Sequence, residues 1–201
     1  MEVITTMIAS QILIRKDLCM KNHLLNEYDI HKYVYSLFPL EKGIVRPFIF
    51  KDKGEKHGFR EIMLLSTNYP QNPDFGICKS KKVPEELLNY SGYKFSVKLN
   101  PVIRNKGKDK SIQGIENIKS WFLKKTPIWG FQVDERTLET SPINVLIIKD
   151  AKKNRTLIKQ CVEFSGQFTV LDRDALRKSF CEGIGRGKSF GFGLLEIVPI
   201  F

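Results

Sequence analysis

The order of its apolar segments limits what this chain can fold into more than any other feature of the sequence. Residues 3–14 are rich in Ile, Val and Thr, which predicts a β-strand. In residues 22–38 the spacing becomes helical, because Ile30, Val34 and Leu37 fall on one stripe. Further strands are predicted at 46–50, 59–66 and 76–83, with a polar loop at 51–58 between the first two.

The second half of the chain repeats this order and adds a second helix. Residues 93–103 alternate between apolar and polar side chains, as a half-buried strand does, and a basic loop follows. An amphipathic helix is predicted at 115–125, and Asp172 or Asp174 is a suitable N-cap for another that runs to Glu182. The remaining strands are predicted at 145–149, 156–164, 168–171 and 192–199.

A strand, a helix and paired strands in each half indicate an α+β protein of two ferredoxin-like units, the fold of RNA-recognition domains. We place the units at residues 1–88 and 93–201, with 84–92 as the linker. For the second helix of the first unit the sequence offers only 84–90. A glycine-rich loop precedes the final strand of the second unit.

The composition is that of a folded protein that binds no metal. Of the 201 residues, 42% are hydrophobic, which is enough for a core, and no stretch approaches the roughly 18 apolar residues of a membrane helix. Residues 1–14 lack the basic start and the cleavage site of a signal peptide, so we expect a cytoplasmic protein. The cysteines occur singly, which argues against a zinc finger or a disulfide framework: Cys19, Cys78, Cys161 and Cys181.

Positive charge is concentrated in four clusters. The chain has 33 Lys and Arg against 22 Asp and Glu, a formal net charge of +11. Basic clusters in loops between apolar strands are typical of proteins that bind a polyanion, most often nucleic acid. The clusters are Lys79, Lys81 and Lys82; Arg104, Lys106, Lys108 and Lys110; Lys149, Lys152, Lys153 and Arg155; and Arg186 and Lys188.

Five glycines fall within residues 183–193. The triplet Gly187-Lys-Ser189 resembles the end of a P-loop, but Glu182 stands where that motif needs a glycine, and a predicted helix rather than a strand precedes it. Glycines let a backbone approach a ligand and expose its N–H groups, which suits an RNA backbone when Arg186 and Lys188 lie between them. The alternative is a flexible turn, although a turn needs only one or two glycines.

One face of the predicted helix 22–38 carries Tyr28, His31 and Tyr35, at positions i, i+3 and i+7. An imidazole can move a proton near neutral pH, and RNA supplies its own nucleophile, the 2′-OH, so that its cleavage needs no metal. Lysine, arginine and tyrosine side chains can stabilise the charge on the phosphate. A single histidine on an amphipathic helix is more often structural, so this face alone does not identify a catalyst.

Taken together, these segments resemble the precursor-crRNA endoribonucleases of type I-E CRISPR systems, the CasE family of Cascade subunits. The first helix of that family is similar to Tyr28-Asp-Ile-His31 followed by Tyr35-Ser-Leu-Phe-Pro39, and its C-terminal glycine-rich motif is similar to residues 182–195. Three further segments follow the family order between these two: Arg46-Pro-Phe-Ile-Phe50, Lys98-Leu-Asn-Pro101 and Val162-Glu-Phe-Ser-Gly166.

The resemblance implies tandem ferredoxin-like domains that cut a CRISPR repeat RNA beside its hairpin without a metal or other cofactor. The 2′-OH attacks the adjacent phosphate, and the enzyme keeps the crRNA product in a complex with other Cascade subunits, away from any membrane. It also implies that His31 transfers a proton, that Tyr28 positions or polarises the scissile phosphate, and that Lys188 gives electrostatic support.

Charge, glycine spacing and the resemblance together select a set of RNA-binding residues. The cationic hairpin tip at 152–155 matches the family element that enters the major groove of the RNA stem. An alternative is a non-catalytic subunit that binds and caps RNA, which needs neither Tyr28 nor His31. An ordinary pair of RNA-recognition domains would show aromatic RNA-binding motifs on a strand, which we do not find. The set is Lys98, Asn100, Arg104, Lys149, Lys152, Lys153, Arg155, Gly185, Arg186, Gly187 and Ser189.

Overall fold

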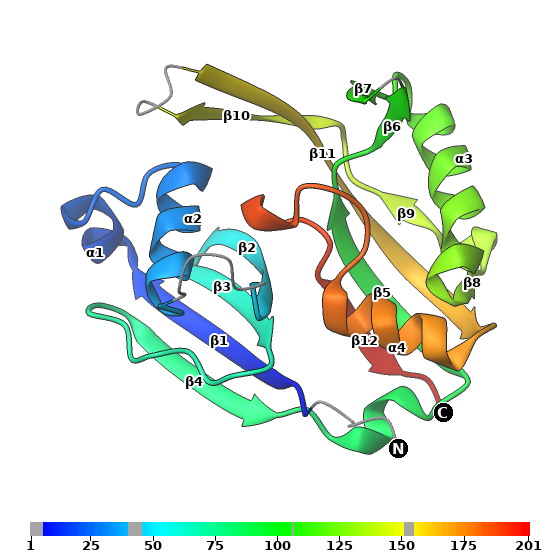
Figure 1. Ribbon diagram of the computed structural model, residues 1–201, viewed down its shortest axis with the longest axis horizontal. Helices are drawn as coiled ribbons and strands as arrows, with labels where there is room; N and C mark the ends of the chain where they lie inside the picture. The colour runs from blue at the N-terminus through cyan, green and yellow to red at the C-terminus, as the bar shows by residue number, and fades with distance from the viewer. Residues whose placement is uncertain (1–5, 40–45, 106, 151–154) are drawn as a thin grey trace.

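Two antiparallel sheets, each built from one half of the chain, form the body of the molecule (Figure 1). The computed structural model describes residues 6–39, 46–105, 107–150 and 155–201. The first sheet has the strand order β2-β3-β1-β4, and each neighbouring pair is antiparallel, which is the arrangement of a ferredoxin-like unit. Its strands are β1 (Ile8–Arg15), β2 (Phe48–Lys56), β3 (Phe59–Ser66) and β4 (Ile77–Lys82).

One helix, α2 (Glu27–Ser36), covers one face of this first sheet. It begins at Glu27 because the Asn26 side chain caps it, accepting hydrogen bonds from the N–H groups of Tyr28 and Asp29 at 3.0 and 3.1 Å. The predicted start at residue 22 is therefore wrong. The predicted apolar stripe is confirmed, since its members are buried against the strands: Ile30, Val34 and Leu37.

The first unit lacks the second helix of a complete ferredoxin-like fold. Residues 67–76, which connect β3 to β4, contain no helix. The candidate segment 84–90 holds only a short 3₁₀ helix, η1 (Glu85–Leu88), and this follows β4 instead of preceding it. Helix α2 covers one face of this sheet, and the second half of the chain packs against the other face, which carries Ile49 and Leu65.

Two further segments of the first half differ from the prediction. A short helix, α1 (Lys16–Lys21), follows β1 directly. Residues 51–56 continue β2, so the predicted loop shrinks to the turn at His57 and Gly58. Polar residues fit this part of the strand because Lys51 is buried in an ion cluster and Asp52 is paired with Arg60. The side chains of Lys53, Glu55 and Lys56 are exposed.

The second sheet has the strand order β10-β11-β5-β12 and is a complete ferredoxin-like unit. Its long strand β11 (Arg155–Val170) runs without a break through Gly166 and pairs with β5 along half its length. Two short strands, β8 (Phe131–Val133) and β9 (Glu139–Thr140), pair with β11 beyond the end of β10. The other strands are β5 (Gly92–Leu99), β10 (Asn144–Asp150) and β12 (Leu195–Pro199).

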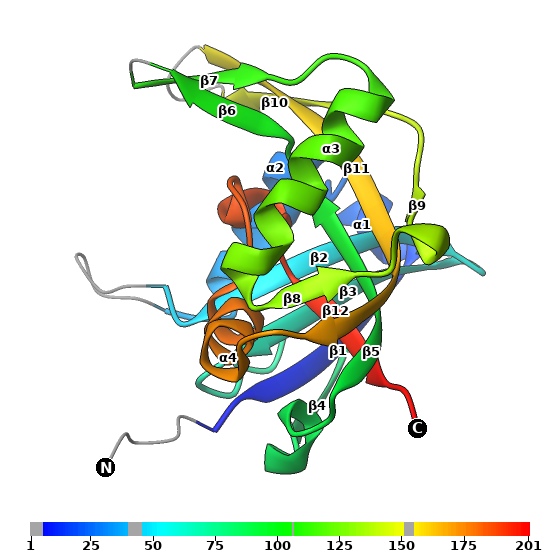
Figure 2. The ribbon, with the colours of Figure 1, turned by 90° about the vertical axis from the view of Figure 1, so that its right-hand side faces the viewer.

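Two helices, α3 (Ile115–Lys125) and α4 (Arg173–Glu182), lie over the outer face of this second sheet (Figure 2). Both bounds agree with the prediction, and Asp172 caps α4 by accepting from two backbone N–H groups at 3.0 Å. The turn after α3 approaches α4 so closely that a Cβ on Gly130 would lie 2.3 Å from the Leu176 nitrogen. None of the helices in the described residues is long and apolar enough to cross a membrane.

The predicted strand 93–103 is broken in the structure. Strand β5 ends at Leu99, and Pro101 cannot donate a hydrogen bond to continue the ladder. The chain then forms a separate hairpin of β6 (Val102–Asn105) and β7 (Lys108–Ser111), so the predicted basic loop is a two-stranded ribbon. Its side chains are mostly exposed, and no apolar alternation marks it in the sequence.

The two units are joined by an apolar cluster and a buried ion cluster. Met7, Ile49 and Leu65 of the first half pack with residues of the linker and the second half (Leu88, Phe180 and Leu194). Lys51, only 3% exposed, donates from Nζ to Ser96 Oγ at 2.8 Å and to carboxylate oxygens of Glu163 and Glu196 at 2.6 Å each. A lysine of β2 thus joins three strands of the second sheet, which fixes the angle between the halves.

Candidate active site at the glycine-rich loop

The glycine-rich loop, residues 183–193, leaves α4 and lies between the two halves, where its 3₁₀ helix η5 (Lys188–Phe190) contacts α2 (Figure 1). The loop is closed at its base, because Ile184 N donates to Gly193 O at 2.9 Å and Gly193 N donates to Lys98 O at 2.8 Å. Gly193 has a φ of +87°, and a Cβ there would lie 2.3 Å from Ile184 O. The five glycines all have positive φ, so the loop shape itself requires them.

His31 is held by the backbone of this loop. Its Nδ1 lies 2.7 Å from the carbonyl oxygen of Ser189, which comes from the opposite half of the chain. A carbonyl oxygen only accepts hydrogen bonds, so Nδ1 carries the proton. In the neutral imidazole the lone pair is then on Nε2, which is the form that a general base needs.

Aromatic rings surround the His31 imidazole. The ring centroids of Tyr28 and Tyr35 lie 6.0 and 4.1 Å from that of His31, so the predicted face of the helix is assembled as the spacing indicated. The ring centroid of Phe190, from the loop, lies 5.3 Å from that of His31. These contacts leave His31 half-buried and restrict the rotation of its ring.

Burial lowers the pKa of His31. The Ser189 carbonyl opposes this, and the positive charges of Arg46 and Lys32 lower the pKa further. Arg46 is tied to the site through a hydrogen bond of 3.3 Å from its guanidinium to Tyr35 Oη. Since the ordinary value for this group is 6.5, His31 is mostly neutral at neutral pH.

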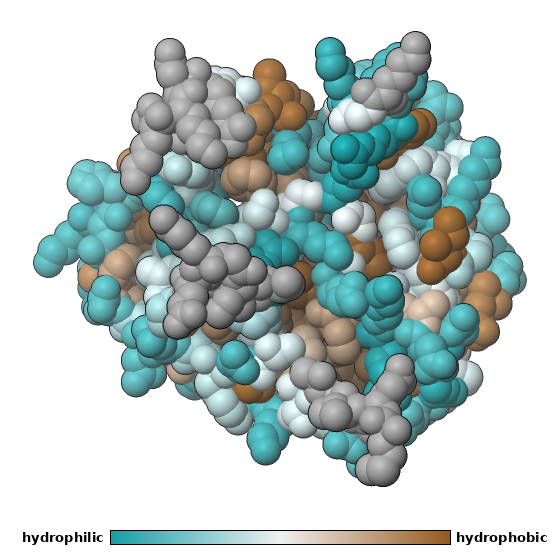
Figure 3. Space-filling view, viewed as in Figure 1, coloured by the Kyte–Doolittle hydropathy of each residue, from teal (hydrophilic) through white to brown (hydrophobic). Residues whose placement is uncertain are grey.

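Lys188 lies in the same electrostatic environment. Burial lowers the pKa of Lys188, Glu182 opposes this, and the charges of Arg46 and Lys178 lower it further. A cation whose pKa is lowered by neighbouring positive charges is stabilised by a bound anion, as an RNA phosphate would be. Hydrophilic residues cover much of this side of the molecule (Figure 3).

Other predicted residues of the loop lie away from His31. Arg186 forms an ion pair of 3.3 Å with Asp109 of the β6–β7 hairpin. Asn100, Arg104 and Gly185 line one cavity together with Arg186. The loop therefore has two sides, one at α2 and one at the β6–β7 hairpin.

The remaining predicted RNA-binding residues are distributed over the second unit. Gly187 caps η5 in the left-handed conformation, and Lys98 places its Nζ 5.8 Å from the centre of the Phe192 ring. Lys149 and Arg155 occupy the end of the β10–β11 ladder, while Lys152 and Lys153 lie outside the described residues. Within the described ranges, no group of three His, Cys, Asp or Glu residues is placed to hold a metal ion.

Four residues at or beside the site were not among the predicted site residues: Tyr35, Arg46, Phe190 and Lys159. Arg46 had a signal, since it begins a motif shared with the CasE family and is the single cation before an apolar strand. Phe190 had none, because its contact with His31 joins residues 159 positions apart. Lys159 of β11, whose Nζ lies 6.0 Å from the centre of the Phe190 ring, was missed for the same reason.

Comparisons with known proteins cover nearly the whole chain. Residues 7–199 match a family described as CRISPR associated protein. The CRISPR system Cascade subunit CasE of Escherichia coli strain K12 is 25% identical in an alignment of 188 positions, which covers 86% of this chain and 92% of that protein.

Three solved structures share the fold. CRISPR endoribonuclease Cse3 bound to a 19-nucleotide RNA has a TM-score of 0.82 and 19% identity over 96% of this chain and 100% of that chain. Thermus thermophilus Cse3, bound to an RNA representing a pre-cleavage complex, has a TM-score of 0.80 and 18% identity with the same coverage. Cas6e from Escherichia coli K-12 has a TM-score of 0.69 and 21% identity, again over 96% and 100% of the two chains. The chain therefore belongs to this family of CRISPR-associated proteins, and it is similar to the CasE subunit that its motifs resemble.

Proposed function

We propose that this protein is an endoribonuclease that cuts precursor CRISPR RNA beside the repeat hairpin without a metal, and that it retains the crRNA product. The observation that carries the proposal is the hydrogen bond from His31 Nδ1 to the Ser189 carbonyl, beside Arg46. That contact presets the base form of the imidazole next to positive charge. Relatives support the substrate, since the similar Cse3 structures contain RNA and CasE is a Cascade subunit.

In the proposed reaction, His31 Nε2 accepts the proton of the 2′-OH at the cut site. The oxygen then attacks the adjacent phosphorus, and the bond from phosphorus to the 5′ oxygen breaks. The departing 5′ oxygen takes up a proton from water and His31 releases its proton to solvent, so that the products are a cyclic phosphate and a 5′-hydroxyl. Lys188 and Arg46 stabilise the charge that develops on the phosphate oxygens. Tyr28, stacked beside His31, positions the scissile phosphate.

The predicted RNA-binding residues extend this site into a wider surface. The hairpin of β10 and β11, with Lys149, Lys152, Lys153 and Arg155, binds the RNA stem, while Lys98 and the glycine-rich loop bind the strand near the cut. Other Cascade subunits bind the protein once it holds its product, in the cytoplasm. The units at 1–88 and 93–201 act together, because His31 and Ser189 come from different units.

The alternative is a subunit that binds and caps RNA without cutting it. Such a protein needs the basic surface but has no use for a histidine whose Nδ1 is fixed by a carbonyl. The arrangement around His31 therefore favours the enzyme.

The test is a cleavage assay with EDTA present and a panel of labelled CRISPR-repeat hairpins beside unstructured RNAs. We expect one cut near the base of a stem, and no cut when that nucleotide carries a 2′-deoxy substitution. Tight hairpin binding without cleavage would support the capping subunit instead. Cleavage that requires a divalent cation would contradict the proposed mechanism.

A further inference from the structure

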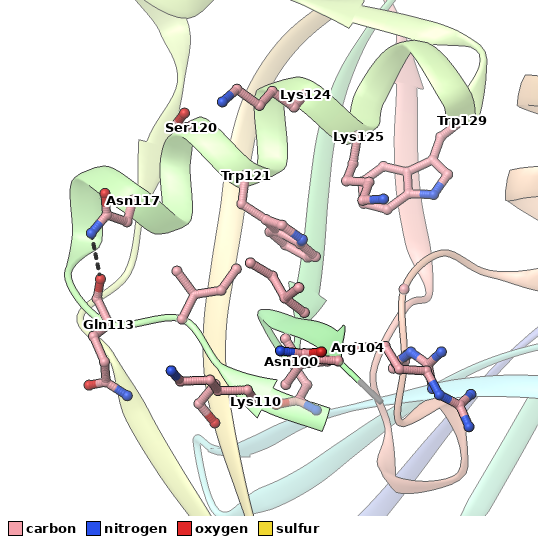
Figure 4. Close-up of a pocket in the computed structure, with 17 residues that line it drawn as sticks. Asn100, Arg104, Lys110, Gln113, Asn117, Ser120, Trp121, Lys124, Lys125 and Trp129 are labelled. Carbon is pink, nitrogen blue, oxygen red and sulfur yellow. Dashed lines mark hydrogen bonds between the residues drawn. The ribbon is translucent and has the colours of Figure 1, made fainter. Parts of the chain in front are cut away.

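A second candidate site lies on the other side of the glycine-rich loop. It is a cavity of about 1240 Å³ between the β6–β7 hairpin, α3 and residues Gly185 and Arg186 of the loop (Figure 4). Typical small-ligand pockets measure roughly 300–1,000 Å³, so this space accommodates a group as large as a nucleotide with its phosphate. Nothing in the proposed cleavage chemistry uses it.

Both tryptophans of the chain line this cavity. Trp121 extends from α3 toward the segment that carries Asn100, and Trp129 lies beside it in the turn after α3 (Figure 4). Their ring centroids are 6.2 Å apart at an angle of 77°. Each is only half-buried, so aromatic surface remains open to the cavity. Stacking on such rings is how proteins bind unpaired bases, whatever the base.

The charge of the cavity is positive throughout. Its lining includes no Asp or Glu, and Asp109, at the edge of the β6–β7 hairpin, is paired with Arg186 at 3.3 Å. Exposed cations at a cavity wall attract phosphate without demanding a fixed geometry. The basic lining residues are Arg104, Lys110, Lys124, Lys125 and Arg186.

A buried acceptor in the cavity wall has no partner. Asn100 is 3% exposed, and its Oδ1 makes no hydrogen bond to any described part of the chain. A buried polar atom left in this state costs free energy, which a bound donor recovers. Every nucleobase carries N–H donors on the edge that pairing uses, and these are free only in an unpaired base.

We propose that this cavity binds one unpaired nucleotide of the RNA substrate, with its base stacked on Trp121 and an N–H of its edge donated to Asn100 Oδ1. The proposal deepens the function given above and rests on it. Arg186 and Ser189 are three residues apart, a span of at most about 11 Å along the chain. The bound nucleotide therefore lies close in sequence to the cut site, and the site selects RNA with a single-stranded flank beside the hairpin.

Tryptophan fluorescence tests this directly, because both tryptophans of the protein are in the cavity. The probe is a single-stranded RNA of five adenylates, titrated into the full-length protein, with binding followed separately by anisotropy. We expect quenching that saturates with binding. An abasic pentanucleotide and inorganic phosphate should leave the fluorescence unchanged. If the adenylates bind without any quenching, or phosphate quenches as strongly, the proposal is wrong.

Substitutions in the lining test whether the base binds at Trp121 and Asn100. Trp121→Leu should weaken binding of the adenylates about tenfold, Trp121→Phe should restore most of this affinity, and Asn100→Leu should weaken it about fivefold. Phe201→Leu is the matched control, since Phe201 is 99% exposed and lies outside the cavity. Circular dichroism melting verifies that each variant is folded. Equal affinities for Trp121→Leu and Phe201→Leu would overturn the proposal.

The proposed function can fail separately. If the adenylates quench the fluorescence but no hairpin of the panel is cut, the endonuclease assignment is wrong and the cavity still binds unpaired RNA. If a hairpin is cut but the adenylates neither quench nor depend on Trp121, the endonuclease stands and the cavity does not bind the base.

Discussion

The two sides of the glycine-rich loop differ in packing and in charge. On the α2 side, Ser189 and Phe190 close tightly on the His31 ring, with contacts fixed by one short hydrogen bond and by aromatic packing. On the β6–β7 side, Gly185 and Arg186 border a wide basic cavity with exposed side chains. Close packing suits chemistry that requires fixed positions, whereas an open basic surface suits the attraction of a polyanion. Rate and affinity should therefore respond to different substitutions.

The largest expected effect is on the α2 side. His31→Asn keeps a side-chain N–H for the Ser189 carbonyl but supplies no base near neutral pH, so the maximal cleavage rate should fall by about 10²–10⁴-fold. Affinity for the repeat hairpin should change little. Single-turnover cleavage and anisotropy measure the two quantities. The matched control is His57→Asn, an exposed histidine with a φ of +52° that asparagine tolerates. A wild-type rate in His31→Asn would show that another group moves the proton.

The second-largest effect is expected on stability, at the ion cluster of Lys51 that joins the two halves. Lys51→Met removes the ammonium group from Glu163 and Glu196, and we expect the free energy of unfolding to fall by about 1–3 kcal/mol. Burial alone would raise the pKa of Glu163, but its bonds to Lys51 and Ser96 bring the pKa below the ordinary 4.5. The stabilisation is therefore present above pH 4.5 and is lost as the pH falls through the depressed pKa.

Urea unfolding at several pH values measures this effect. The difference between the wild-type protein and Lys51→Met should shrink as the pH falls below 4.5. Lys53→Met is the matched control, since Lys53 bonds to Glu196 at 3.2 Å but is 38% exposed. Equal losses in the two variants would mean that the buried position of Lys51 is unimportant.

A smaller effect is expected on the β6–β7 side. Replacing Arg104 and Arg186 by glutamine should flatten the slope of log affinity against log salt by about 1.4–1.8, because each phosphate contact contributes roughly 0.7–0.9. The affinity should change more than the maximal rate. Arg136→Gln, at an 89% exposed arginine elsewhere, is the control. An unchanged slope would mean that the cavity side does not contact phosphate.

The smallest effect concerns pH. His31 acts as a base only when neutral, so kcat/KM should rise with pH, and the depressed pKa places its midpoint below 6.5. A bound phosphate offsets the charges of Arg46 and Lys32, which should move the midpoint of kcat to a higher pH than that of kcat/KM. Pre-steady-state rates between pH 4.5 and pH 8 test this ordering. A kcat/KM midpoint above 6.5 would contradict it.

Local signals account for what the sequence predicted correctly. Helix α3 has the predicted bounds because a clean apolar period and Pro127 define them, and Asp172 caps α4 as its side-chain chemistry favours. The β6–β7 ribbon and the end of β2 were missed because both segments are polar. Backbone hydrogen bonds to the neighbouring strand make them strands, and these leave no apolar pattern in the sequence. In the sequence Lys51 is typical of an exposed loop. In the structure it is buried, because Glu163 and Glu196 of the other half pair with its charge.

The site was predictable only where residues lie near one another in the sequence. Tyr28, His31 and Tyr35 share a helix face, so their spacing was informative. Predicting that Ser189 meets His31 requires the packing of two units, and predicting that Trp121 and Asn100 line one cavity requires the packing of α3 beside the end of β5. No local pattern encodes either arrangement. The glycines gave a partial signal. Their number indicated an unusual loop, but the sequence did not show that the loop requires positive φ at each of them.

The bond between His31 and Ser189 has a consequence for how such a protein can change over generations. The two halves have nearly the same architecture, which suggests exchangeable parts. Yet the histidine belongs to one half and the carbonyl that fixes its tautomer belongs to the other. A substitution that shifts either half by an ångström separates them, and only a matching change across the interface restores the contact. The proposed catalytic centre therefore depends on both halves together, and neither half can be replaced alone.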